Sequence, residues 1–340
     1  MNFSDFTGKK LSPEESSAIN FLRLLCIVSV VMIHSHTLQF ASSPEAYSII
    51  QQFNNLFTVF PALPLLFIVS GYLFFHAVDR EKNFFPAYRA KLKKRVGSLL
   101  VPYLIWNSVG MVIGYFRHDP DLNLESVGGF LQAYWPLDPM GHPIGRAIWF
   151  IRNLIFFSLL SPVYFLLIKY LKHATLLLVA VLLFVEIPVD YLYFNVFLLI
   201  GSYLGLYKFS VRQLVARVPL NMAAVWYLPL LLVRSFVGLG AWFENLFALY
   251  AFFFFAACCL RVRNRFWGGL SSFSMFVYVS HLYISYSVTT VVLFVLPATL
   301  PGLLAAMPLS CVLTVSICAG VYVLFNRFCP RFLSFLIGGR

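Results

Sequence analysis

Charged side chains are scarce in this chain: Asp, Glu, Lys and Arg make up only 11% of its 340 residues, and only 13 residues are acidic. Soluble domains usually contain about 25% charged residues. Hydrophobic residues reach 60%, and 37 of them are phenylalanines. This balance excludes a soluble globular domain and predicts an integral membrane protein.

Motifs of several enzyme classes are missing too. The sequence has no HExxH, GxSxG or Walker phosphate-binding motif, and no His-x4-Asp motif of the glycerolipid acyltransferases. Its six cysteines form no CxxC pair and lie in apolar stretches or close to the C-terminus. We therefore expect no bound metal, no nucleotide hydrolysis and no disulfide.

Apolar stretches long enough to cross a bilayer recur along the chain. A spanning helix needs about 20 apolar residues because the hydrocarbon core is roughly 30 Å thick. About ten such stretches fit, which predicts an all-α, polytopic fold, although the fifth and sixth are short enough to form a tilted or re-entrant pair. The predicted crossings are 17–40, 54–78, 99–116, 147–168, 174–187, 191–207, 220–234, 244–260, 270–296 and 306–326.

Basic residues concentrate in alternate connections. Twenty of the 25 lie in six segments: 1–16, 79–98, 169–173, 208–219, 261–269 and 327–340. The positive-inside rule therefore places both termini in the cytoplasm, and the net charge of +12 needs no nucleic acid to explain it. We expect a single membrane domain over 17–326 between two cytoplasmic tails, 1–16 and 327–340, in contact with membrane lipids. The oligomeric state is left open.

The first apolar stretch carries two ionisable residues, Arg23 and His34. They are eleven residues apart, so on a helix they lie within roughly 20° of one face and about 16 Å apart along the axis. Charged groups at membrane depth are costly and usually functional, and histidine, with an unperturbed pKa of about 6.5, suits proton transfer. The alternative is that Arg23 reaches the headgroups and His34 bonds a nearby carbonyl.

Five segments, taken in order, resemble the membrane acyltransferase-3 family of bacterial O-acyltransferases. They are NFLRLLCIVSVVMIH (20–34), PLLFIVSGYLFF (64–75), YRAKLKKRVGSLLVPYLIW (88–106), IWFIRNL (148–154) and SMFVYVSHLYIS (274–285). The resemblance implies a ten-helix inner-membrane enzyme that takes an acyl group, usually acetyl from cytoplasmic acetyl-CoA, and delivers it to a hydroxyl of a glycan outside. Such glycans include lipopolysaccharide O-antigen, exopolysaccharide and lipid-linked precursors.

Arg23 and His34 match the signature pair of that family. The resemblance implies that His34 is the catalytic residue, acting either as a base on the acceptor hydroxyl or as a transient acyl carrier. A coenzyme A head held at the cytoplasmic surface could extend its pantetheine arm toward His34, and an offset of about 16 Å suits that arm.

Other residues are expected to support donor or acceptor. A cluster of basic side chains has topology as its simplest explanation, but it could also bind the phosphates of acyl-CoA, with the guanidinium of Arg95 foremost; its other members are Lys91, Lys93 and Lys94. Arg152 could line the cavity and polarise a thioester carbonyl, or reach the headgroups. Trp149 is either a cavity residue or an interfacial anchor.

His281 matches a late histidine of the same family, although a bundle-facing structural histidine would look identical. Ser70 and Gly71 are expected to allow close helix packing. The rival hypothesis is a glycan or lipid transporter in which Arg23, His34 and His281 line the path. Such proteins usually contain internal repeats or paired broken helices, and neither is evident. A catalytically inactive membrane scaffold is a third possibility.

Overall fold

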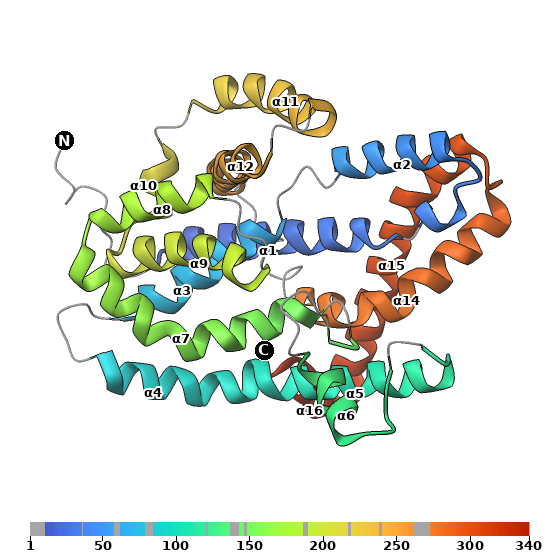
Figure 1. Ribbon diagram of the computed structural model, residues 1–340, viewed down its shortest axis with the longest axis horizontal. Coiled ribbons are helices and arrows are strands. Elements are labelled where there is room, and N and C mark those ends of the chain that lie inside the picture. Colours follow the sequence, from blue (N-terminus) through green and yellow to red (C-terminus); the bar gives the residue numbers. More distant parts are fainter. Residues whose placement is uncertain are drawn as a thin grey trace.

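The protein is described by a computed structural model over residues 11–35, 37–57, 62–78, 84–119, 122–136, 143–145, 148–185, 190–216, 219–237, 240–261 and 273–339. Within these residues the regular elements are helices and there is no β-strand, so the predicted all-α class is confirmed. In chain order the helices are α1 (Pro13–Ile33), η2 (Thr37–Phe40), α2 (Pro44–Phe57), α3 (Ala62–His76), α4 (Phe84–Arg95), η3 (Val96–Leu100), α5 (Val101–Phe116), α6 (Val127–Tyr134), α7 (Trp149–Leu171), α8 (Ala174–Phe184), α9 (Asp190–Leu206), α10 (Val211–Ala216), α11 (Leu220–Val237), α12 (Ala241–Arg261), α14 (Ser274–Val295), α15 (Leu300–Phe328) and α16 (Pro330–Ile337) (Figure 1).

Helices of membrane-spanning length agree with the sequence prediction in part. In the described residues, 6 helical spans are long and apolar enough to cross a membrane: Pro13–Phe40, Phe84–Phe116, Trp149–Leu171, Trp242–Arg261, Ser274–Val295 and Leu300–Phe328. Four shorter apolar helices fall on the remaining predicted crossings: Ala62–His76, Ala174–Phe184, Phe194–Leu206 and Leu220–Arg234. The protein is therefore a multi-pass membrane protein. The count of ten crossings and the side of each terminus stay predictions.

Some element boundaries in the structure differ from those predicted from the sequence. The stretch 54–78 is divided between α2 and α3, and 58–61 lie outside the described residues. The basic connection 79–98 is helical from Phe84 onward and continues through η3 into α5, because Lys, Arg, Ala and Leu are good helix formers. The predicted tail 327–340 contains α16, which packs against α5, α14 and α15.

The first helix begins at a capping box. The Ser12 side chain accepts a hydrogen bond from the Glu15 amide at 3.1 Å, and the Glu15 carboxylate accepts one from the Ser12 amide at 3.0 Å. The same carboxylate accepts from the hydroxyl of Ser210 (2.6 Å) and the amide of Arg212 (3.2 Å) at the start of α10. One buried acid therefore caps α1 and joins it to α10.

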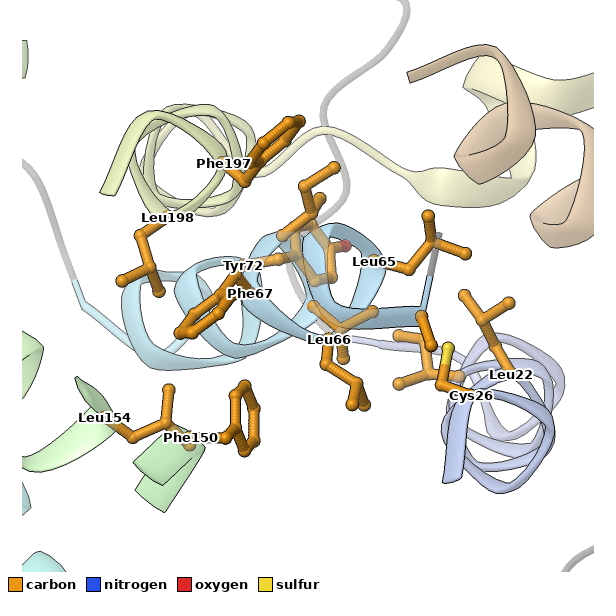
Figure 2. Close-up of a cluster of buried hydrophobic side chains, with 14 of the residues drawn as sticks. Leu22, Cys26, Leu65, Leu66, Phe67, Tyr72, Phe150, Leu154, Phe197 and Leu198 are labelled. Atoms are coloured by element: carbon orange, nitrogen blue, oxygen red, sulfur yellow. The ribbon is translucent and has the colours of Figure 1, made fainter. Parts of the chain in front are cut away.

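The centre of the bundle is the packing of α3 against α9, beside α1 (Figure 1). Figure 2 shows Leu198 and Phe197 of α9 on one side of α3, with Leu22 and Cys26 of α1 on the other. The two backbones approach closely because each helix places a glycine against the backbone of the other. A Cβ at Gly71 would overlap the Leu198 carbonyl oxygen, and one at Gly201 would overlap that of Ile68. Gly71 thus allows close packing, as small residues commonly do in membranes.

Replacing Gly201 with valine tests this packing. The new side chain has no space against the backbone of α3, so we expect a destabilisation of about 1–3 kcal/mol, typical of overpacking. Thermal unfolding in detergent, followed by size-exclusion chromatography, measures the effect. Gly320→Val is the matched control, because nothing lies within 4 Å of a Cβ there. Equal unfolding midpoints for the two variants would contradict the packing argument.

The helix from Phe84 to Phe116 contains one irregular turn, η3, which is π-helical. Pro102 follows it and cannot donate a hydrogen bond to the carbonyl four residues earlier, which is one reason for the α-helix to break here. The extra residue per turn rotates α4 relative to α5. Short π-helical turns occur often at functional sites, and the turn begins directly after Arg95.

Candidate active site

A cavity of about 120 Å³ lies among α1, α3, α7, α14 and the end of α4. Most of its wall is apolar: Figure 2 shows Phe150 and Leu154 of α7 beside α3, and both line the cavity together with Leu66 of α3. Two cations also line it, Arg23 from α1 and Arg95 from the end of α4. The structure therefore brings together Arg23 of the predicted signature pair and Arg95 of the predicted phosphate-binding cluster.

No acidic residue is among the described residues that line this cavity. Nor does either arginine form an ion pair with a carboxylate in the described part of the chain. Buried cations are costly unless an anion or a dipole compensates them. Arg23 lines a space between helices, and its role stays a prediction. The cavity is electrostatically suited to a negatively charged or strongly polarised group.

The four basic side chains of the cluster on α4 do not line one common surface. Arg95 lines the cavity and lies 5.7 Å from the ring centroid of Phe74, over which Lys91 also lies at 4.8 Å. Lys93 is exposed. Lys94 lines a separate groove beside α16. Of the four predicted phosphate ligands, only Arg95 lines the cavity.

The two histidines named from the sequence meet. The ring centroids of His34 and His281 are 5.4 Å apart, with an angle of 39° between the planes. His34 is the C-cap of α1 and is half-buried, whereas His281 is 0% exposed. This contact joins the first helix to α14, far away in the sequence.

Backbone hydrogen bonds fix the proton on one ring nitrogen of His281. Its Nδ1 lies 2.8 Å from the carbonyl oxygen of Tyr278 and 3.2 Å from that of Val277. A carbonyl oxygen only accepts, so Nδ1 carries the proton and Nε2 is the basic nitrogen of the neutral ring. A ring held in this way is suited to accept a proton at Nε2.

The arginine cavity and the histidine pair are separate but adjacent. His34 does not line the cavity, so the structure does not show one passage that contains both members of the signature pair. Tyr278 connects the two places: its ring lines the cavity, lies edge-on to Phe150 at 5.8 Å, and is 6.3 Å from the ring of His281. Sequence reasoning gave Tyr278 no role, although its position three residues before His281 was a signal.

Two predicted residues of α7 lie next to the site without lining the cavity. Arg152 is only 2% exposed, inside the bundle. Trp149 packs against Phe67 at 6.4 Å and Phe194 at 5.3 Å, inside the bundle. In α7 it is Phe150, Ile151 and Leu154 that form the cavity wall. Roles for Arg152 and Trp149 toward donor or acceptor stay predictions.

A helical membrane bundle with buried arginines and a histidine pair fits an acyltransferase, and comparison with known proteins agrees. The family model described as "Acyltransferase domain" matches residues 16–323, and the chain therefore belongs to this acyltransferase family. A curated relative is the succinoglycan biosynthesis protein ExoH of Rhizobium meliloti (strain 1021), 25% identical over 206 residues. The alignment covers 56% of this chain and 53% of the relative, about half the length of each. No solved structure matches the chain.

Proposed function

We propose that the protein moves an acyl group, acetyl in the first instance, from cytoplasmic acetyl-CoA to a hydroxyl of a lipid-linked or cell-surface glycan. The observation that carries this proposal is the cavity that Arg23 and Arg95 both line, with no carboxylate among its described lining residues. Membership of the acyltransferase family supports the reaction class, and the name of the succinoglycan biosynthesis relative supports a polysaccharide acceptor. The family also favours an enzyme over a transporter.

The size of the cavity determines how the donor would bind. A volume of about 120 Å³ is below the roughly 300 Å³ of pockets that enclose a whole small molecule. It suits the thin pantetheine arm and not the nucleotide head. In this arrangement the head stays at the basic end of the bundle, where Arg95 contacts a phosphate or the arm, and Arg23 contacts the arm deeper inside.

In this proposal the histidine pair carries out the proton transfer that accompanies acyl transfer. His34 accepts the proton of the acceptor hydroxyl, and the oxygen attacks the thioester carbonyl carbon. A carbon–oxygen bond forms, the carbon–sulfur bond breaks, and the proton returns to the thiolate, which leaves as coenzyme A. With its Nδ1 proton held by backbone carbonyls, His281 offers Nε2 beside His34 and stabilises the protonated form of the pair.

A second route passes through an acyl-histidine on His34. Incubation with labelled acetyl-CoA without acceptor separates the two, because direct transfer predicts no label on the protein. Label retained after denaturation by wild type, and absent from a His34 variant, would establish the covalent route.

The proposal is tested with the purified protein in detergent, labelled acetyl-CoA and a cell-envelope glycan extract. We expect label in the glycan and a rise in the thermal unfolding midpoint with coenzyme A. Stabilisation by glycan alone, with no effect of coenzyme A and no transfer, would overturn the enzyme and favour transport.

Tyr278 is expected to limit the size of the acyl group that the enzyme accepts, because it lines the cavity and its ring is 6.3 Å from that of His281. In Tyr278→Ala we expect the ratio of butanoyl-CoA to acetyl-CoA turnover to rise at least about tenfold, the usual effect of space for added methylenes. Tyr278→Phe keeps the ring and should keep the ratio. Ratios of kcat/KM measure this, and an unchanged ratio in the alanine variant would show that Tyr278 does not limit acyl length.

A further inference from the structure

A second hollow lies beside the helix that carries Arg95. It is a groove of about 660 Å³ between α16 and the turn η3. Lys94, Gly97, Ser98 and Val101 line it from the long helix, and Arg331, Ser334, Phe335, Gly338 and Gly339 line it from α16 and the residues that follow. The groove therefore combines two cations, two hydroxyls and two apolar side chains.

The walls are fixed by packing within the protein. Leu333, Leu336 and Ile337 of α16 are buried, and the Trp106 indole donates a hydrogen bond to the Leu336 carbonyl at 3.1 Å. Gly338 has a φ of +75°, and a Cβ there would lie 2.6 Å from the Cα of Ser98. Glycine thus lets the end of α16 rest directly on η3, so the groove is formed before any ligand enters.

The polar part of the groove is suited to a phosphate group. Arg331 lines it from α16 and Lys94 from α4, and no acidic residue is among the described residues that line it. A guanidinium fork and an ammonium are the usual phosphate ligands of proteins. The hydroxyls of Ser98 and Ser334 are further hydrogen-bond donors.

The apolar part indicates which phosphate compound would bind. Phe332 and Phe335 are 50% and 56% exposed, and α16 presents them beside Arg331 on the side away from its buried face. A short helix with phenyl groups next to cations is typical of a membrane interface, where the rings enter the acyl layer and the cations meet headgroups. A soluble anion would use the cations but not the rings.

This groove is distinct from the arginine cavity. Lys94 and Arg95 are neighbours in sequence, yet each lines a different hollow. Arg331 lies after residue 323, where the match to the acyltransferase family ends. A phosphate held by Lys94 and Arg331 is therefore not in the cavity assigned to the acyl donor.

We propose that the groove between α16 and η3 binds the phosphate headgroup of an anionic phospholipid, with an acyl chain along Phe335 and Phe332. The shared chemistry is a phosphate group, which a lipid or a soluble nucleotide could supply, and the exposed phenyl rings favour the lipid. This inference is independent of the acyl-transfer reaction.

Lipid retention by the full-length protein tests it. The protein is reconstituted in nanodiscs of equimolar phosphatidylcholine and phosphatidylglycerol, extracted in detergent, and its bound lipids are identified by native mass spectrometry. We expect selective retention of phosphatidylglycerol by wild type. In the double variant Lys94→Gln with Arg331→Gln, we expect retention to fall by about 30-fold, the effect of losing two cations near an anionic headgroup.

A matched control carries the same change in net charge. Arg89→Gln with Lys93→Gln removes two exposed cations of α4 that do not line the groove, so retention should stay close to wild type. Equal retention by the two double variants would overturn the site. A parallel arm without lipid adds inorganic phosphate or coenzyme A. Thermal stabilisation by either, lost only in the groove variant, would overturn the lipid assignment in favour of a soluble phosphate compound.

Discussion

Replacement of His34 with asparagine is expected to reduce acyl transfer to glycan by about 10²–10⁴-fold, the usual contribution of a positioned acid or base. The rings of His34 and His281 are 5.4 Å apart. His34 is half-buried and His281 is 0% exposed, so His34 is the more accessible member of the pair. Initial rates with labelled acetyl-CoA measure the loss. Asparagine is well tolerated near helix C-termini, so the variant should fold.

The control for this variant is His118→Asn. His118 is an exposed residue with a φ of +51°, a conformation that asparagine adopts readily, and it lies outside both hollows. Its transfer rate should equal that of wild type. In His34→Asn the stabilisation by coenzyme A should persist, because the donor arginines are intact. Full transfer activity in His34→Asn would remove the histidine from the chemistry and leave the arginine cavity as the only supported part of the site.

Hydropathy determined the fold class and the place of each apolar helix, because the bilayer requires long apolar runs whatever their partners. It could not give crossing lengths exactly. The stretch 54–78 reads as one crossing, yet the chain forms α2 and α3 as separate helices. The amphipathic pattern of residues 330–337 was hidden by their position after the last apolar run, so α16 was predicted as a tail.

For the candidate site, some features could be predicted from the sequence and others could not. The spacing of Arg23 and His34 along one helix was accessible from the sequence, since it depends only on helix geometry. The contact of His34 with His281 was not, because it depends on how α1 packs against α14. The division of the basic cluster was also hidden, because it depends on which neighbouring elements lie beside each face of α4: Arg95 lines the cavity with α1, α3, α7 and α14, and Lys94 lines the groove with α16.

Because Arg95 lines the cavity and Lys94 lines the groove, these two residues are a natural test pair for the donor site. In Arg95→Ala we expect the KM for acetyl-CoA to rise about 10–100-fold, corresponding to loss of a hydrogen bond to a charged group. Lys94→Ala, assayed in the same detergent, should change it less than about threefold, because Lys94 lines the other groove.

The glycan KM should be unaffected in both variants, which separates loss of donor binding from general damage. The neighbouring positions differ by one residue and carry the same formal charge, so a simple surface-charge effect predicts equal increases in KM. Equal increases would therefore place the phosphates on the whole basic face of α4. A rise confined to Arg95→Ala would place the donor in the cavity that Arg95 shares with Arg23, which Tyr278 also lines, with its ring 6.3 Å from that of His281.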